Sequence, residues 1–128
     1  MRSPGLTLDT GALIAFEKSK REVMALLEHA WQAGITLHVP TVVVAETWRD
    51  GKRSARLAKL LAACRVDPLV EDVARLAGEA LGSVRAAATI DAIVVASAHA
   101  IGAPVVTSDP GDLRALADYF GGLPLISI

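Results

Sequence analysis

The sequence predicts a three-layer α/β/α domain built on a central, mostly parallel sheet of about five strands. Short apolar runs of strand composition alternate along the chain with longer segments of helical spacing, and glycine or proline stands at most boundaries. Strands that are buried on both faces read as such short apolar runs. With 128 residues, of which 52% are hydrophobic, we expect residues 1–128 to form one domain with a substantial core.

The first half of the chain predicts two strands and three helices. The strands are expected over 6–8 and 35–39, and the helices over 12–16, over 19–33 and from 41 onward. Residues that break regular structure stand at the boundaries, namely Pro4 and Gly5 before the first strand, Gly34 after the second helix and Pro40 after the second strand. We expect Thr41 to cap the third helix.

The second half predicts four more helices and three more strands. The helices are expected over 49–61, 70–81, 89–101 and 110–120, and the strands over 65–69, 105–106 and 123–128. The helix over 89–101 is the most apolar of the set. We expect it to be buried and to stop at Gly102.

Four acidic residues stand where such a sheet would bind a ligand. Asp9 and Asp109 each follow a predicted strand, and Asp91 opens the buried helix. Ligands of open parallel sheets bind beyond the carboxyl ends of the strands, where the strand order reverses. Glu46 shares a helix face with Val42 and Val43, so we expect its carboxylate to point inward.

Each aspartate also has a purely structural explanation when it is considered alone. Asp9 and Asp109 are suited to helix N-caps, and Asp112 stands where the capping-box partner of Asp109 would be. Asp91 is suited to the first turn of a helix, where a negative charge is favourable. Glu46 is the exception, because an acid in the middle of a helix has no capping role.

If these carboxylates converge, their charge must be compensated. Two bare carboxylates about 4 Å apart repel by roughly 4 kcal/mol at an effective dielectric constant near 20. Several such pairs need either protons or a cation. Oxygen ligands without a nearby histidine or cysteine favour Mg²⁺ or Mn²⁺ over zinc, and these ions activate water in phosphodiester cleavage.

Four short segments carry a resemblance to a known family. In chain order they are Leu8-Asp9-Thr10-Gly11-Ala12-Leu13-Ile14, Ala45-Glu46, Asp91-Ala92-Ile93-Val94-Val95-Ala96 and Val106-Thr107-Ser108-Asp109. Together they span nearly the whole chain. The ordered set resembles the PIN domain, and specifically the VapC-type toxin ribonucleases of bacterial and archaeal toxin–antitoxin pairs.

The resemblance implies an acidic site for Mg²⁺ or Mn²⁺, formed by Asp9, Glu46 and Asp91 and completed by Asp109, and makes these four residues catalytic. The supporting residues that it implies are Thr10, Thr107 and Asp112. The implied activity is an endoribonuclease that hydrolyses RNA with metal-activated water and without a covalent protein intermediate. The implied partners are a second copy in a homodimer and a cognate antitoxin that covers the active cleft.

A basic run provides candidate RNA contacts, with Arg85 as a further candidate. The run comprises Arg49, Lys52, Arg53, Arg56 and Lys59. It is either the solvated face of a helix or a rim that binds phosphates near Glu46, since phosphate contacts supply much of the affinity for nucleic acid. The formal net charge of −1 requires any such contact to be local. Aromatic residues make up only 4%, which disfavours a base-stacking platform.

Other classes of protein lack their required features here. No apolar run approaches the roughly 20 residues of a membrane span, no apolar leader follows Arg2, and the single cysteine, Cys64, suits a reducing compartment. We therefore expect a cytoplasmic protein. A phosphotransfer receiver would need adjacent acids after the first strand, and a haloacid-dehalogenase-type phosphatase would need an aspartate at Gly11. The remaining alternative is a PIN-like module that binds RNA or protein without cutting.

Overall fold

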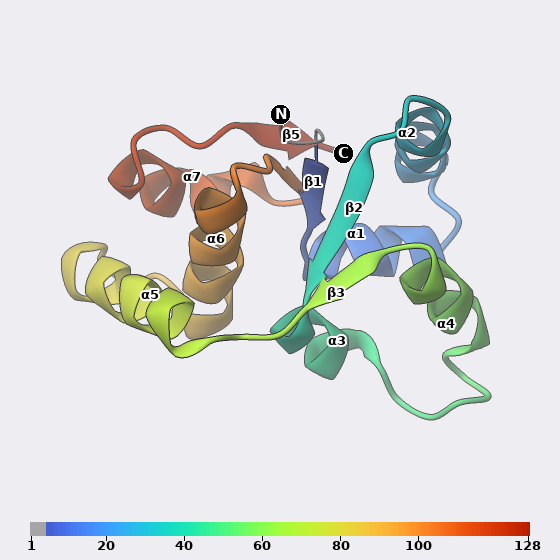
Figure 1. Ribbon diagram of the computed structural model, residues 1–128, viewed down its shortest axis with the longest axis horizontal. Coiled ribbons are helices and arrows are strands. Elements are labelled where there is room, and N and C mark those ends of the chain that lie inside the picture. Colours follow the sequence, from blue (N-terminus) through green and yellow to red (C-terminus); the bar gives the residue numbers. More distant parts are fainter. Residues whose placement is uncertain (1–4) are drawn as a thin grey trace.

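The central sheet has five strands, and all of them are parallel. The computed structural model describes residues 5–128, and its strands are β1 (Gly5–Leu8), β2 (Thr36–Pro40), β3 (Arg65–Asp67), β4 (Val105–Thr107) and β5 (Leu125–Ser127). Their order is β3-β2-β1-β4-β5 (Figure 1). The predicted class is confirmed. Pro4, which was expected to break the chain before the first strand, and Arg2, after which no apolar leader was expected, lie outside the described range.

The strand order reverses at β1. On one side β1 pairs with β2, with Leu6 opposite Leu37, and on the other it pairs with β4, with Leu8 opposite Val106. The chain therefore steps outward from β1 to β3 and then crosses back to continue with β4 and β5. Such a reversal leaves a crevice beyond the carboxyl ends of the two strands that flank it.

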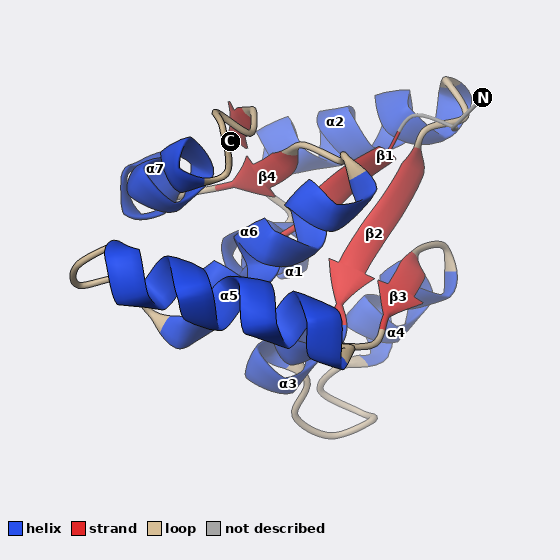
Figure 2. Cartoon of the chain, turned by 60° about the vertical axis from the view of Figure 1, so that its left-hand side comes forward, coloured by secondary structure: helices blue, strands red, loops and turns tan. Residues whose placement is uncertain are grey.

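Helices cover both faces of the sheet. Within the described residues they are α1 (Thr10–Glu17), α2 (Arg21–Gln32), α3 (Thr41–Thr47), α4 (Ala55–Ala62), α5 (Glu71–Ser83), α6 (Thr89–Ile101) and α7 (Pro110–Tyr119). Helices α5, α6 and α7 lie on one side, and α1, α2 and α4 lie on the other (Figures 1 and 2). None of the helices within residues 5–128 has the length and apolar character that crossing a membrane requires.

Helix α6 is the buried helix that the sequence predicts. Its buried residues are Ala92, Val94, Val95, Ala96 and Ala98. A helix with so much of its surface buried must be covered on several sides, and α6 packs against α5, α7 and the sheet (Figure 2). It ends at Gly102, whose φ of 70° is left-handed and favours glycine. The packing fixes the first turn of α6 in space.

The segment between α3 and α4 differs from the prediction. Residues 48–54 form a loop and turns, and α4 begins only at Ala55. Gly51 weakens helix formation in this segment, and Asp50 Oδ1 accepts a hydrogen bond from the backbone N–H of Arg53 at 2.8 Å, which stabilises a turn instead. Three of the five basic residues of the predicted run therefore lie on a loop, namely Arg49, Lys52 and Arg53.

Cys64 provides a test of the packing beside β3. Its side chain is half-buried, and burial raises the pKa of its thiol from 9.0 to about 11. Because the thiolate is the reactive form, we expect alkylation by iodoacetamide near neutral pH to be about 100-fold slower in the folded protein than in urea. Mass spectrometry of the labelled protein measures both rates. Equal rates in the two conditions would contradict the packing of Cys64.

Candidate metal centre

Asp9 lies at the junction of β1 and α1. Its backbone N–H donates to the carbonyl of Val106 on β4 at 3.3 Å, which joins the two strands at the point of reversal. Its Oδ1 accepts a hydrogen bond from the N–H of Ala12 at 2.8 Å, so Asp9 is the N-cap of α1. The capping explanation is correct for Asp9. The same carboxylate also lines a pocket, and its second oxygen leaves room for both roles.

Thr107 links the ends of β1 and β4. Its side chain is fully buried, and its Oγ1 accepts a hydrogen bond from the N–H of Asp109 at 2.9 Å. Asp109 is exposed and occupies the cap position of α7 without a side-chain capping bond. The capping explanation is therefore wrong for Asp109, whose side chain lines the same pocket as Asp9.

Asp91 is the residue on which the charges of the other acids converge. It lies half-buried in the first turn of α6. Burial raises the pKa of Asp91 most, and the negative charges of Asp112, Asp9, Glu46 and Asp109 raise it further. The structure therefore brings the other predicted acids within electrostatic reach of Asp91.

Two further carboxyls show the same crowding. Burial raises the pKa of Asp9, against the opposing effect of hydrogen bonds from the Thr107 hydroxyl and from backbone N–H groups. A hydrogen bond to Asp109 raises the pKa of Asp112, and the charge of Asp109 adds to the effect. Asp112 is thus an exposed acid paired with another acid. Two neighbouring carboxylates repel each other, so such a pair is stabilised when it shares a proton or binds a cation.

The aspartates line one pocket of about 220 Å³. Its oxygen-bearing side chains are those of Asp9, Thr10, Asp91, Thr107, Ser108, Asp109 and Asp112. Glu46 lies beside this pocket and is held by a hydrogen bond from the Thr10 hydroxyl at 2.6 Å. Glu46 is exposed, so the prediction of an inward carboxylate is wrong. Helix α3 has only seven residues and buries Val43 and Thr47 instead.

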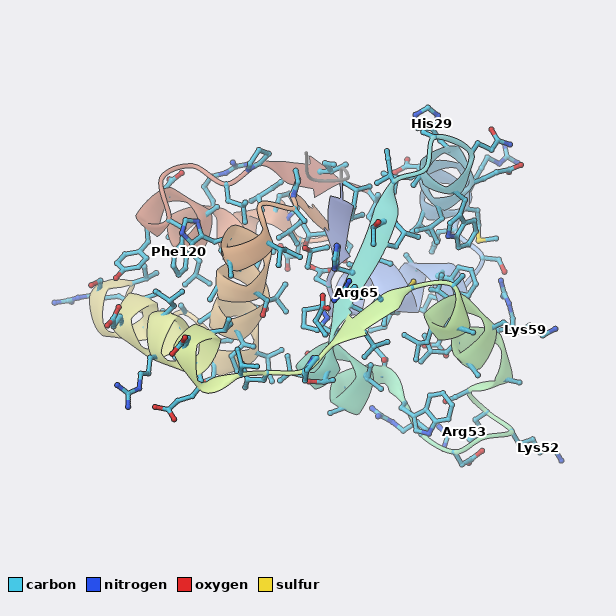
Figure 3. The ribbon with its side chains drawn as sticks, in the orientation of Figure 1. His29, Lys52, Arg53, Lys59, Arg65 and Phe120 are labelled. Carbon is cyan, nitrogen blue, oxygen red and sulfur yellow. The ribbon has the colours of Figure 1, made fainter. Side chains whose placement is uncertain are left out.

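The donor set is oxygen-only, which fits Mg²⁺ or Mn²⁺. The histidines lie elsewhere: His38 pairs with Asp67 at 2.8 Å, His99 stacks on Phe120 with ring centroids 4.8 Å apart, and His29 is exposed on α2 (Figure 3). Over residues 5–128, no three side chains of histidine, cysteine, aspartate or glutamate are gathered closely enough to hold one ion. Mg²⁺ keeps several water ligands and needs only one or two carboxylates, so the pocket fits an ion of that kind.

The predicted basic run does not share this pocket. Arg56 donates to the carbonyl of Glu17 at 3.2 Å and to Oγ of Ser19 at 2.6 Å, and its guanidinium lies 5.0 Å from the centre of the Phe16 ring. These contacts give Arg56 a structural role. Lys52 and Arg53 lie on the outer loop (Figure 3).

Ser108 is a site residue that the sequence analysis did not select. Its side chain lines the acidic pocket, and a Cβ atom added at Gly11 would overlap its Oγ. The glycine therefore makes room for the serine hydroxyl beside Asp9. The available signal was its position between two residues that were selected, Thr107 and Asp109.

Comparison with known proteins identifies the family. The family model described as the PIN domain matches residues 6–119, and the chain therefore belongs to the PIN domain family. No curated protein matches the chain.

Solved structures share this fold over nearly their whole length. VapBC2 from Rickettsia felis, bound to a promoter DNA fragment, has a chain with a TM-score of 0.80 at 15% identity, covering 97% of this chain and 98% of its own. A chain of a Klebsiella pneumoniae toxin–antitoxin complex has a TM-score of 0.75 at 21% identity, and the match covers 95% of this chain and 96% of that one. A chain of VapBC-1 from nontypeable Haemophilus influenzae has a TM-score of 0.76 at 17% identity, and the match covers 96% of this chain and 97% of that one.

Proposed function

We propose that the protein is a metal-dependent endoribonuclease that acts as the VapC-type toxin of a toxin–antitoxin pair. The observation that carries this proposal is the pocket at the strand reversal of a PIN domain, where Asp9, Asp91, Asp109 and Asp112 meet. The similar solved structures are toxin–antitoxin complexes, which supports the toxin assignment.

In this proposal the acids divide the work of holding Mg²⁺ or Mn²⁺. Asp9 and Asp91 are the direct ligands, because both are partly buried in the pocket. Asp109 and Glu46 would complete the acidic site. The ion supplies charge neutralisation and water activation for phosphodiester hydrolysis. Thr10 positions Glu46 through its hydrogen bond, as second partners commonly orient metal-binding carboxylates.

The proposed partners are a cognate antitoxin and a second copy of the chain. Large apolar side chains are exposed on several elements, at Ile14, Met24, Trp31, Val66, Leu69, Val70 and Tyr119. Exposed apolar surface of this kind supports burial against partners. The cytoplasmic localisation expected from the sequence stays a prediction.

A PIN-like module that binds RNA or protein without cutting is the second candidate. The observation that favours it is the lack, within residues 5–128, of a preassembled group of three metal-binding side chains. The two candidates differ in whether a divalent ion enables bond cleavage.

The test is incubation of the purified protein with a structured RNA in Mg²⁺ or Mn²⁺, with chelator and with added antitoxin. We expect internal cleavage that stops when the metal is chelated or when the antitoxin binds. RNA binding without cleavage in either ion would favour the binding module. Cleavage that continues in excess chelator would sink the metal-centre proposal.

A further inference from the structure

Two more pockets adjoin the acidic pocket. One, of about 410 Å³, shares Ser108 with it and extends to the start of α2. The other, of about 320 Å³, shares Asp91 and Asp112 with it and extends to the linker 84–88 between α5 and α6. Because each neighbour shares wall residues with the acidic pocket, the three pockets lie next to one another in a row, which we call the three-pocket groove.

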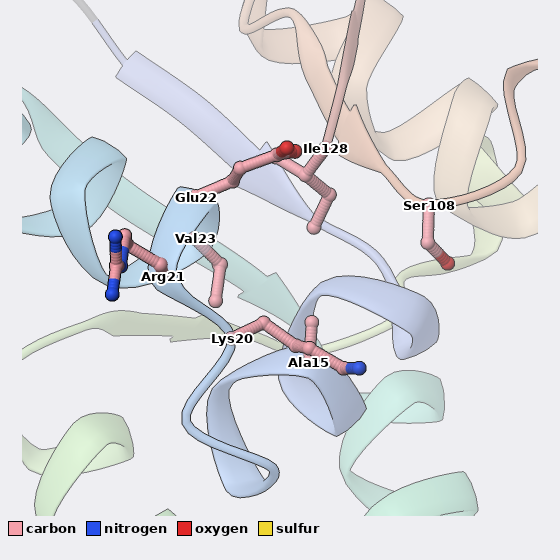
Figure 4. Close-up of a pocket in the computed structure, with 7 residues that line it drawn as sticks. All are labelled: Ala15, Lys20, Arg21, Glu22, Val23, Ser108 and Ile128. Atoms are coloured by element: carbon pink, nitrogen blue, oxygen red, sulfur yellow. The ribbon is translucent and has the colours of Figure 1, made fainter.

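A lysine lies at the α2 end of the three-pocket groove. Figure 4 shows the Lys20 side chain running past Ala15, toward the side of the pocket on which Ser108 lies, whereas Arg21 points the opposite way. Within residues 5–128 the Lys20 ammonium forms no salt bridge or side-chain hydrogen bond, although Glu22 also lines this pocket. The charge of Lys20 is therefore available to an anion in the groove.

An arginine lies at the other end. Arg85 is exposed in the linker, lines the pocket that contains Asp91 and Asp112, and has no salt bridge among the described residues. The rest of the linker wall is apolar and consists of Val84, Ala86, Ala87 and Ala88. Among the described residues that line this pocket, Arg85 is the one basic side chain.

The order of charges along the groove is basic, acidic, basic. We propose that the three-pocket groove is the path of a single RNA strand, with Lys20 and Arg85 binding the phosphates on either side of the phosphate held over the acids. This inference rests on the proposed function and adds the residues that hold the substrate. A duplex is bound by a broad surface across its grooves, whereas two isolated cations match the flexible backbone of one strand.

The rival path runs over the loop 48–54, where the sequence analysis placed Arg49, Lys52 and Arg53. That path borders Glu46, since Arg49 follows it by three residues. The Arg49 side chain donates to the carbonyl of Trp48 at 2.8 Å, and no residue of the loop lines the acidic pocket or the two pockets beside it. The groove therefore offers the more direct approach to the acids.

The experiment measures binding of a fluorescein-labelled single-stranded RNA of about ten nucleotides in Mg²⁺ as the salt concentration is raised. An Asp9→Asn background, in which the proposed direct ligand is neutral, is expected to slow cleavage during the measurement. Lys20→Gln and Arg85→Gln are each expected to weaken binding several-fold. Each is also expected to reduce the salt slope, which is the steepness with which the logarithm of the binding constant falls with the logarithm of the salt concentration, by about 0.7, the value for one phosphate contact on a single strand. Arg75→Gln, an equal charge change on an exposed face of α5 whose side chain pairs with Glu71, is the matched control.

The salt slope separates a phosphate contact from a structural effect, since a loss of stability does not change the number of counterions released. Unchanged slopes for both Lys20→Gln and Arg85→Gln would overturn the path, as would a slope loss for Arg49→Gln and Arg53→Gln instead. Cleavage by the wild type is measured separately. RNA binding with the expected slopes but no cleavage would reject the nuclease proposal and support the RNA path along the groove. Cleavage with unchanged slopes would support the nuclease proposal and reject the path.

Discussion

Asp9→Asn and Asp91→Asn are each expected to lower metal-dependent RNA cleavage by about 10²-fold or more while raising the melting temperature in metal-free buffer. Each substitution removes a partly buried charge that the neighbouring acids repel. Asparagine retains the capping oxygen that Asp9 gives to α1, so the helix start is preserved. A gain of 1 kcal/mol corresponds to a rise of roughly 2–8 °C, measured by circular dichroism.

The pH dependence of this stabilisation has a definite sign. The pKa values of Asp9 and Asp91 are raised above the ordinary value of 3.8, so the folded protein binds more protons than the unfolded chain between the two values. Stability is therefore lost as the pH rises through that interval. The advantage of each asparagine variant is expected to be fully present above the folded pKa and to vanish in acid.

Mg²⁺ should make the wild type more stable than the asparagine variants, the opposite of the order expected in metal-free buffer. An ion that binds only the folded state stabilises it by about 2.7 kcal/mol at 100 times its dissociation constant, so the wild type is expected to gain and Asp91→Asn to gain little. Asp72→Asn is the control, because Asp72 lies in the first turn of α5, where a negative charge is favourable. It is expected to lose a little stability in either buffer. An Mg²⁺ gain equal in wild type and Asp91→Asn would rule out Asp91 as a ligand.

The fold could be predicted because apolar spacing is a local signal. Strands β1, β2 and β4 lie within a residue or two of their expected limits, since breakers such as Gly34 mark the ends. The convergence of Asp9 and Asp109 also followed from sequence, because the carboxyl ends of parallel strands meet at one edge. Asp91 joins them because it lies in the first turn of α6, which packs against β1 and β4. What connected Asp9 and Asp109 was the rule for strand reversal, which requires no knowledge of side-chain packing.

The predictions that failed depend on short-range competition that spacing does not reveal. Glu46 lies beside three valines, but the brevity of α3 leaves its side chain exposed. Thr41 is the first residue of α3, with Pro40 in the cap position, so the expected cap does not form. Gly51 and Asp50 lie within the basic run, and the turn there delays the start of the predicted helix to Ala55. In each case a local backbone preference outweighed the periodic pattern.

Thr107→Val is expected to lower both stability and cleavage. The substitution keeps the shape of a fully buried side chain but removes the acceptor of the Asp109 N–H and the hydroxyl that hydrogen-bonds to Asp9. Loss of a hydrogen bond costs about 0.5–1.5 kcal/mol, and loss of a group that orients a metal-binding residue costs about 10–100-fold in activity. Thermal melting and single-turnover cleavage measure the two effects.

Thr7→Val separates the two consequences. Thr7 is equally buried on β1, and its hydroxyl donates to the carbonyl of Ala103 at 3.1 Å, away from the acids. The same change there is expected to lower stability while cleavage below the melting transition stays at the wild-type rate. A cleavage loss confined to Thr107→Val identifies its hydroxyl as a positioning group. Equal cleavage by the two variants would reduce Thr107 to a structural residue, because both remove one buried hydroxyl from the same sheet and only one of them adjoins the carboxylates.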